Sequence, residues 1–365
     1  MILQCNPKAG YLAHKKEIDE ACFRVLDSGW YILGGECLAF ENEYSKFNQT
    51  EFALGVANGT DALELALRAI GITAGDQVVT VSHTAVATVS AISRVGAEPV
   101  FVDVLDDYTL DPEQLETVLK QIDAKAVIVV HLYGQPADMG LIMPIAKQFN
   151  VPVIEDCAQA HGALINNKKV GSFGIVGCFS FYPTKNLGGI GDGGMLVTSN
   201  KEVYEAAKVI RQYGWKERYI SEVQGINSRL DELQAAILRI KLKYLQQSNQ
   251  QRQKLAQFYF DNLFDTHLFL PAKRSGTEHV FHQFVVRTQN RDYLQSRLSE
   301  KQIATAVHYP KPVHQQPAYN DPKYCPLPLV NTERLCSQIL SLPMYPELSE
   351  NEVAAVSDAV NSILY

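Results

Sequence analysis

The chain has 365 residues, an ordinary globular composition and a formal net charge of −7 at pH 7. This length predicts a large domain with a smaller one, and the negative charge argues against general binding to nucleic acids or anionic membranes. Seven scattered cysteines without a Cys-x-x-Cys pair indicate reduced thiols, neither a disulfide framework nor a zinc site. No apolar window approaches the ~18 residues of a membrane span. We therefore expect a cytoplasmic protein.

Apolar residues at helical spacing predict a helix over Lys15–Leu26, ended by Ser28-Gly29. The aromatic residues of the loop 29–35 could line a pocket, but we expect them to pack against the body of the domain. From residue 51 to about 155, strand and helix patterns alternate, with near-continuous apolar strands such as Val127–Val130. This alternation predicts a largely parallel sheet with helices on both faces. Ligands of such sheets bind at the carboxyl ends of the strands.

The segment Asn58–Asp61 lies between a predicted strand and a helix over 62–70 that Gly71 closes. A helix N-terminus offers unpaired N–H groups and the positive end of the helix dipole, which suit an anion. A plain N-cap by Asn58 or Thr60 is an equally good reading of the same residues.

Asp156 follows the apolar residues Val153 and Ile154 at the end of a predicted strand. Because a buried charge needs a partner, we favour a functional carboxylate there over a surface charge. His161, a few residues later, is expected to be a hydrogen-bonded structural histidine.

Lys185 lies in the stretch 178–195, among aromatic and small residues, with five glycines after it. An enclosed apolar neighbourhood lowers the pKa of a lysine amine and makes it a nucleophile, and glycines allow unusual backbone angles. Without further context, a solvated loop lysine is the commoner reading.

A long helix starting at Asp231 is expected to bridge into a second domain. The predicted domains are therefore residues 1–249, and a smaller α+β unit over residues 250–365. In the second unit, residues 281–287 are strand-like, and 293–301 and 351–363 show helical patterns. Between these elements lie the segment Ala304–His308 and proline-rich loops.

Three of these features match the needs of pyridoxal 5′-phosphate (PLP). Lys185 is able to form a Schiff base, and Asp156 would keep the pyridine nitrogen protonated. The helix start at Asn58 suits the phosphate group. Each feature is weak alone, but their combination predicts a PLP site.

Four segments then closely resemble the nucleotide-sugar aminotransferases of the DegT/DnrJ/EryC1/StrS family. They are Asn58–Leu63, Glu155–Gln159, Phe179–Asn186 and Asn227–Ala236. The resemblance covers essentially the whole chain. It implies the α/β architecture of PLP fold type I, as in aspartate aminotransferase.

The resemblance implies roles for individual residues. Lys185 would bond the cofactor and move the proton during catalysis, and Asp156 would pair with the pyridine nitrogen. The other implied cofactor contacts are Gln159 to the phenolic oxygen, and Gly59, Thr60 and Ser180 to the phosphate.

Two further roles follow from the resemblance. Asn227 would reach the phosphate from the neighbouring subunit, so a homodimer is expected. His83 would stack on the cofactor ring, or would be no more than a polar residue at a strand end.

The implied reaction moves an amino group from L-glutamate to a keto nucleotide sugar, for surface-polysaccharide or glycoconjugate biosynthesis. Thr305–Pro310, Gln315–Pro317 and His131–Gln135 look more like the branch that acts at C3. A dTDP-3-oxo-6-deoxyhexose is therefore favoured, with a UDP-2-acetamido-3-oxo sugar second and a 4-keto sugar third.

Tyr182, Tyr213 and His308 are candidate residues of the sugar pocket, although each could equally serve packing. A different class of function is a catalytically silent PLP-fold protein that binds or regulates. No basic segment or helix-turn-helix appendage supports it.

Overall fold

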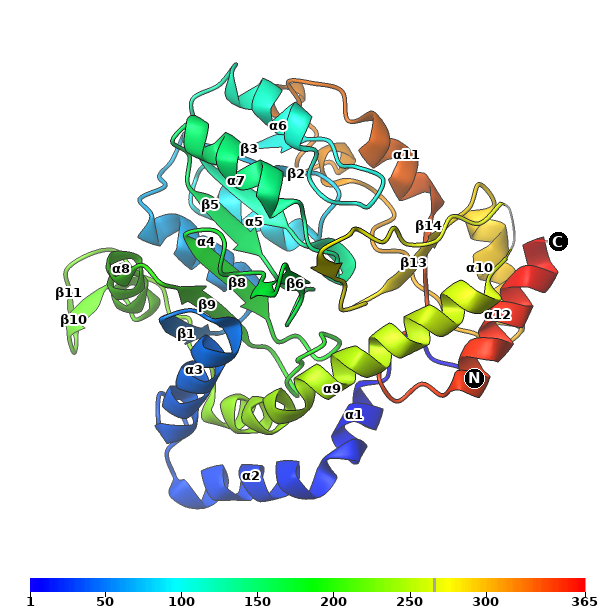
Figure 1. The fold of residues 1–365 in the computed structure, drawn as a ribbon. Helices are drawn as coiled ribbons and strands as arrows, with labels where there is room; N and C mark the ends of the chain where they lie inside the picture. Colours follow the sequence, from blue (N-terminus) through cyan, green and yellow to red (C-terminus); the bar gives the residue numbers. More distant parts are fainter. Residues whose placement is uncertain (265–266, 365) are drawn as a thin grey trace.

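Figure 1 shows a computed structural model of the chain, which describes residues 1–264 and 267–364. Its centre is a seven-stranded sheet of order β1-β9-β8-β5-β4-β2-β3. The strands are β1 (Phe52–Val56), β2 (Gln77–Val81), β3 (Glu98–Val102), β4 (Ala124–Val130), β5 (Val153–Asp156), β8 (Val176–Ser180) and β9 (Gly194–Thr198). Neighbouring strands from β8 to β3 pair in parallel, whereas β9 is antiparallel to both its neighbours. The predicted, mostly parallel sheet is confirmed.

Helices cover both faces of this sheet because successive side chains of a strand point to opposite sides. One face carries α4 (Gly59–Ala69), α5 (Val86–Arg94) and α8 (Lys201–Arg211). The other face carries α3 (Gly35–Asn48), α6 (Pro112–Leu119), α7 (Met139–Gln148) and part of α9 (Glu232–Asn262).

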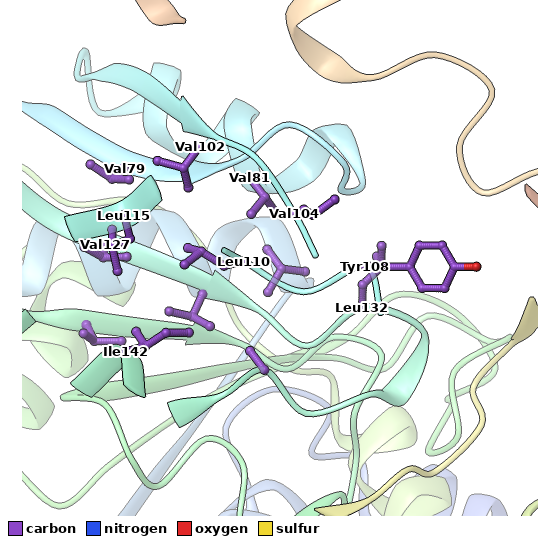
Figure 2. Packing of buried hydrophobic residues seen from close by; sticks show 14 of the residues in the cluster. Val79, Val81, Val102, Val104, Tyr108, Leu110, Leu115, Val127, Leu132 and Ile142 are labelled. Carbon is purple, nitrogen blue, oxygen red and sulfur yellow. The ribbon is translucent and has the colours of Figure 1, made fainter. Parts of the chain in front are cut away.

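The two faces divide the residues of each strand between them. In β2, Val78 packs with α4 and α5, whereas Val79 packs with Leu115 of α6 and Ile142 of α7. Figure 2 shows part of the second cluster, with Val79 and Val127 among the labelled residues. Burial on both faces is the reason that these strands read as continuous apolar runs.

The long helix α9 starts after its N-cap Asp231, as predicted, and in Figure 1 it runs from α3 toward α12 (Glu350–Leu364). The second half of α9 packs in a separate apolar cluster, whose buried members lie between Leu255 and Val360. Ile2, from the start of the chain, packs against this cluster. This cluster includes α10 (Arg291–Glu300), β13 (Phe284–Arg287) and β14 (Ile339–Leu342). The domain division at residue 250 stays a prediction, and Ile2 suggests that the first residues belong with the second unit.

The remaining elements are short or peripheral. They are α1 (Pro7–Ala13), α2 (Lys15–Ser28), β6 (Leu164–Ile165), β7 (Lys168–Lys169), β10 (Trp215–Glu217), β11 (Ile220–Ser221), β12 (Thr277–Glu278), α11 (Val330–Gln338) and the 3₁₀ turns η1 (Leu132–Gly134), η2 (Val313–Gln315) and η3 (Pro322–Tyr324). In the ranges described, no helix has the length and apolar character that crossing a bilayer requires.

One expectation about local structure is wrong. Trp30 and Tyr31 do not pack against the domain, since they are 64% and 50% exposed. The segment Ala304–His308 is irregular, and Ala306 makes a single bridge to Ser341. The N–H of Ala304 donates to the Ile2 carbonyl, and the His308 carbonyl accepts the hydroxyl of Tyr133.

Candidate active site

A cavity of about 350 Å³ lies at the carboxyl ends of β4, β5 and β8. It gathers most of the predicted site residues, which come from widely separated parts of the sequence. Those that line it are Gly59, Thr60, Asp156, Gln159, Ser180, Tyr182, Lys185 and His308.

The N-terminus of α4 forms one wall of the cavity. Asn58 is extended, and its side-chain oxygen accepts the N–H of Asp61 at 2.8 Å, which is a regular N-cap. The cap satisfies only one of the first amides, so those of Gly59 and Thr60 stay available beside the cavity that both residues line. The two readings of this segment, cap and anion site, are therefore compatible.

Ser180 closes this wall from the end of β8. A Cβ atom on Gly59 would lie 2.7 Å from the Cβ of Ser180, so only glycine lets the two main chains approach this closely. His161 supports Ser180 from below, with Nε2 donating to the Ser180 carbonyl at 2.8 Å and Nδ1 bonded to the hydroxyl of Tyr44. The prediction of a structural role for His161 is confirmed.

Asp156 is the last residue of β5 and is buried. One carboxylate oxygen accepts the hydroxyl of Thr88 at 2.8 Å, and the other accepts the N–H of Ala158 at 3.1 Å. Because Thr88 uses its only proton on Asp156, its own oxygen accepts the hydroxyl of Thr84 at 2.8 Å. Burial raises the pKa of Asp156 above its usual value, although the bonds from Thr88 and Ala158 oppose the shift. A cationic partner in the cavity would restore the charge of this carboxylate.

Lys185 lies in the connection from β8 to the antiparallel β9, which turns back over the end of the sheet. Its N–H donates to the Tyr182 carbonyl at 2.8 Å, which folds the segment into a turn. Burial lowers the pKa of the Lys185 amine to about 8, and the Asp156 carboxylate opposes this shift. A sizeable fraction of the amine is therefore neutral near pH 8 and able to act as a nucleophile or base.

The glycines after Lys185 serve close packing more than unusual backbone angles. Within residues 188–194, all of them described, only Gly191 has a positive φ, at 153°. A Cβ atom on Gly194 would lie 2.3 Å from the carbonyl oxygen of Asn58. Gly194 thus lets β9 begin directly against the cap of α4.

Gln159 reaches the cavity with a fixed amide orientation. Its side-chain oxygen accepts the N–H of Tyr133 at 2.7 Å, and its nitrogen donates to the hydroxyl of Tyr309 at 3.2 Å. The amide nitrogen keeps one further proton, so Gln159 can donate to an acceptor in the cavity.

His308 lines the cavity from the C-terminal half of the chain, and its Nδ1 is bonded to the hydroxyl of Ser341 at 2.9 Å. Burial and, after it, the nearby Lys185 lower the pKa of His308 to about 4. The ring is therefore neutral at pH 7 and acts as a hydrogen-bonding group.

Sequence reasoning missed several lining residues, among them His282, Gln283 and Tyr309. Tyr309 adjoins the predicted His308, so its place in the same motif could have indicated it. His282 and Gln283 reach the cavity through the folding of the C-terminal half, and no local pattern indicates them.

Three predicted residues lie outside the cavity of their own chain. The ring of His83 is fully buried and its Nε2 bonds the hydroxyl of Tyr133 at 3.0 Å, so a stack on a ring in the cavity does not fit. Thr84 and Ala85 line the cavity in its place. Tyr213 is 39% exposed and packs against Trp215, while Asn227 is exposed.

His131, Glu155 and Cys157 are the one group of described residues with the spacing of metal ligands. The Glu155 carboxylate already accepts the N–H groups of Gly171, Phe173 and Gly174 and pairs with His131 at 3.0 Å. With its oxygens satisfied in this way, Glu155 serves as a structural anchor beneath the cavity.

Comparisons with known proteins agree with this geometry. The sequence profile described as the DegT/DnrJ/EryC1/StrS aminotransferase family matches residues 13–361. The dTDP-3-amino-3,6-dideoxy-alpha-D-galactopyranose transaminase of Aneurinibacillus thermoaerophilus is 46% identical over 355 residues, 97% of each chain.

Two solved structures are similar along nearly the whole chain. DesV of S. venezuelae, solved in complex with a ketimine intermediate, superposes with a TM-score of 0.95 and 43% identity, covering 99% of this chain and 98% of DesV. NtdA of Bacillus subtilis, solved with bound cofactor PMP, has a TM-score of 0.89 and 30% identity, covering 96% of this chain and 82% of NtdA. The profile match and these similarities place the chain in the DegT/DnrJ/EryC1/StrS aminotransferase family, and the protein is an aminotransferase.

Proposed function

We propose that the cavity binds pyridoxal 5′-phosphate and that the protein aminates C3 of a keto nucleotide sugar. The observation that carries the proposal is the convergence of three groups in one cavity. These are an amine of lowered pKa on Lys185, a buried carboxylate on Asp156 and the free amides at the start of α4. The PMP bound to the similar NtdA supports the identity of the cofactor.

The residues fit the cofactor in their chemistry. Gly59, Thr60 and Ser180 would hold its phosphate, because amide N–H groups at a helix start favour an anion and the glycine leaves room for it. Asp156 would face the pyridine nitrogen, and Gln159 would donate to the phenolic oxygen. When bound, the cofactor supplies an electron sink for the carbon that gains or loses the amino group.

Lys185 would bond the cofactor and then carry the proton between carbon atoms. A pKa near the working pH suits both tasks, because the amine must take up a proton in one step and release it in the next. Tyr182, which lines the cavity and is 53% exposed, and the neutral His308 are proposed to contact the sugar.

A dTDP-3-oxo-6-deoxyhexose is the proposed acceptor, with L-glutamate as the amino donor. The support is the 46% identical relative, whose name specifies a dTDP-3-amino-3,6-dideoxy sugar. A UDP-2-acetamido-3-oxo sugar and a 4-keto sugar are the competing acceptors.

The proposal is tested with a panel of nucleotide sugars. The purified protein with PLP is first treated with glutamate, which should convert the visible absorbance to that of the amino form of the cofactor. Nucleotide sugars with a keto group at C3 or at C4, each carrying dTDP, UDP or GDP, are then added one at a time. The amino sugar that forms is measured by mass spectrometry. Fastest turnover with the dTDP 3-keto sugar is expected.

Other outcomes of this panel are equally decisive. A faster reaction with a UDP sugar or a 4-keto sugar would show that this sugar, and not the dTDP 3-keto sugar, is the acceptor. A protein that stays colourless with PLP and ignores glutamate would instead favour the silent binding or regulatory module.

A further inference from the structure

Tyr133 is the residue that connects the two halves of the cavity. It lies in η1 after β4 with a left-handed backbone (φ 59°), and its side chain is buried. Its hydroxyl has two partners, the carbonyl of His308 and the Nε2 of His83, the latter at 3.0 Å.

The direction of these hydrogen bonds follows from proton counting. The His308 carbonyl can only accept, so the single hydroxyl proton of Tyr133 is donated there. His83 must then donate from Nε2 to the Tyr133 oxygen, which makes it a neutral ring with a bare Nδ1. Nδ1 is buried and finds no partner in the described part of the chain.

The main chain of Tyr133 orients a second cavity residue. Its N–H donates to the side-chain oxygen of Gln159 at 2.7 Å, which turns the Gln159 nitrogen toward the hydroxyl of Tyr309 at 3.2 Å. Tyr133 therefore binds both ends of the segment His308-Tyr309, directly through its hydroxyl and indirectly through Gln159.

We propose that Tyr133 is a positioning residue that holds His308 and Tyr309 at the wall of the cavity, where they can contact the keto sugar. His83 supports it by donating a hydrogen bond from Nε2 to the Tyr133 hydroxyl. The inference rests on the proposed function and assigns to His83 a role other than cofactor stacking. Most of the proposed cofactor contacts do not depend on the hydroxyl of Tyr133. Lys185, Asp156 and the start of α4 belong to other contacts, and Gln159 is bonded to the Tyr133 N–H, which Tyr133→Phe keeps.

The first test is Tyr133→Phe, which keeps the ring and leaves the same left-handed backbone. We expect kcat/KM for the keto sugar to fall about tenfold, since the His83 N–H and His308 carbonyl lose a buried partner. The visible absorbance and the affinity for PLP should change little, whereas the thermal midpoint should fall by a few degrees because two buried polar groups are left unpaired. The reaction of the PLP form with glutamate should change less than the reaction with the sugar.

Tyr108→Phe is the matched control. Tyr108 is another buried tyrosine, its ring packs against those of both His83 and Tyr133, and its hydroxyl has no hydrogen bond to the residues described. This variant should retain the kinetic constants of the wild type. An equal loss in both variants would overturn the proposal, as would unchanged sugar kinetics in Tyr133→Phe.

Substitutions of His83 separate the hydrogen bond from simple packing. His83→Gln can place an N–H near the position of Nε2 and should recover most of the activity, whereas His83→Phe should behave like Tyr133→Phe. If both variants lose PLP and unfold at the same lower temperature, His83 is structural only and the proposal fails.

Hydrogen exchange of the PLP-bound protein gives a readout that needs no substrate. In Tyr133→Phe, the amides of residues 306–309 should exchange faster than in the wild type, while those of β4 and β5 should not. Unchanged exchange at 306–309 would overturn the positioning role. If the variant shows faster exchange while the wild type turns over no keto sugar, the proposed function fails, but the connection from Tyr133 to His308 and Tyr309 stands.

Discussion

The negative charge of the Asp156 carboxylate is expected to be required for efficient catalysis in the cavity. Asp156→Asn keeps the shape but removes the charge that would hold a ring nitrogen protonated. We predict a loss of about 100-fold in kcat/KM for the sugar, as expected for a charged hydrogen bond of up to ~3 kcal/mol. Steady-state kinetics at saturating PLP measure the loss.

Asp103→Asn is a suitable control for Asp156→Asn. Asp103 is also buried and accepts backbone N–H groups, here those of Asn331 and Thr332, but it lies outside the cavity. Its substitution should lower thermal stability and leave the turnover of the folded protein unchanged. A comparable kinetic loss in both variants would contradict a specific role of Asp156.

The lowered pKa of Lys185 predicts how this residue reacts in the PLP-free protein. An amine is nucleophilic only when neutral, so its reactivity rises with pH up to its pKa and then levels off. With formaldehyde and a borohydride reagent, Lys185 should reach half its maximal methylation rate near pH 8, against 10.5 for an ordinary lysine. Peptide mass spectrometry measures the rates; a midpoint near 10.5 would show that burial does not shift this amine.

At the level of elements, the start of α4 offers a test of the phosphate site. Gly59→Ala would bring a methyl group to 2.7 Å from the Cβ of Ser180 and push the first amides of α4 away from the cavity. We predict at least tenfold weaker binding of PLP, measured by titration of its absorbance.

Gly35→Ala is the matched control for Gly59→Ala. Gly35 is also the first residue of a helix, α3, but a Cβ atom there would meet nothing within 4 Å. This variant should bind PLP like the wild type. If Gly59→Ala binds PLP equally well, the start of α4 does not hold the phosphate.

Much of the fold could be predicted because the sheet is buried on both faces. The alternation of apolar strands and capped helices, including the cap at Asn58 and the start of α9 at Asp231, is written in local sequence. The helix α3 escaped detection because its buried residues, among them Cys37, Tyr44 and Asn48, are too mixed in polarity to show a clear apolar stripe.

The site could be predicted only where a residue and its motif act together. Lys185 and Asp156 follow from their motifs, but beyond the end of β2 the regular alternation of side chains stops. Whether His83 or the following residues Thr84 and Ala85 face the cavity depends on long-range contacts such as the bond of Ser82 to His314. Such contacts leave no local pattern in a sequence.

For the whole molecule, one exposed surface has the character of an interface. Trp30, Tyr31 and Leu38 are 50–64% exposed, although large apolar side chains are usually covered. The backbone of Ile32 forms a bridge to Asp231, so this surface adjoins the segment that carries Asn227. The family resemblance implies a homodimer in which Asn227 reaches the phosphate in the neighbouring cavity, and we propose that a second copy of the chain covers this surface.

This arrangement predicts that two defective chains can complement each other. Lys185→Ala inactivates the cavity of its own chain, whereas Asn227→Ala would weaken the cavity of the partner. A heterodimer of the two variants then contains one cavity with both residues intact. At limiting PLP, it should regain about half of the wild-type activity, because one of its two sites is complete.

The experiment uses coexpressed chains with different tags, isolated by two affinity steps so that only mixed dimers remain. The control pairs Lys185→Ala with Asp156→Asn, since both residues line the cavity of their own chain and no complete site can form. That pair should stay inactive. If the Asn227 pair is no more active than the mean of its two parent homodimers, Asn227 does not act across the interface. The exposed aromatic surface around Trp30 would then need a different explanation.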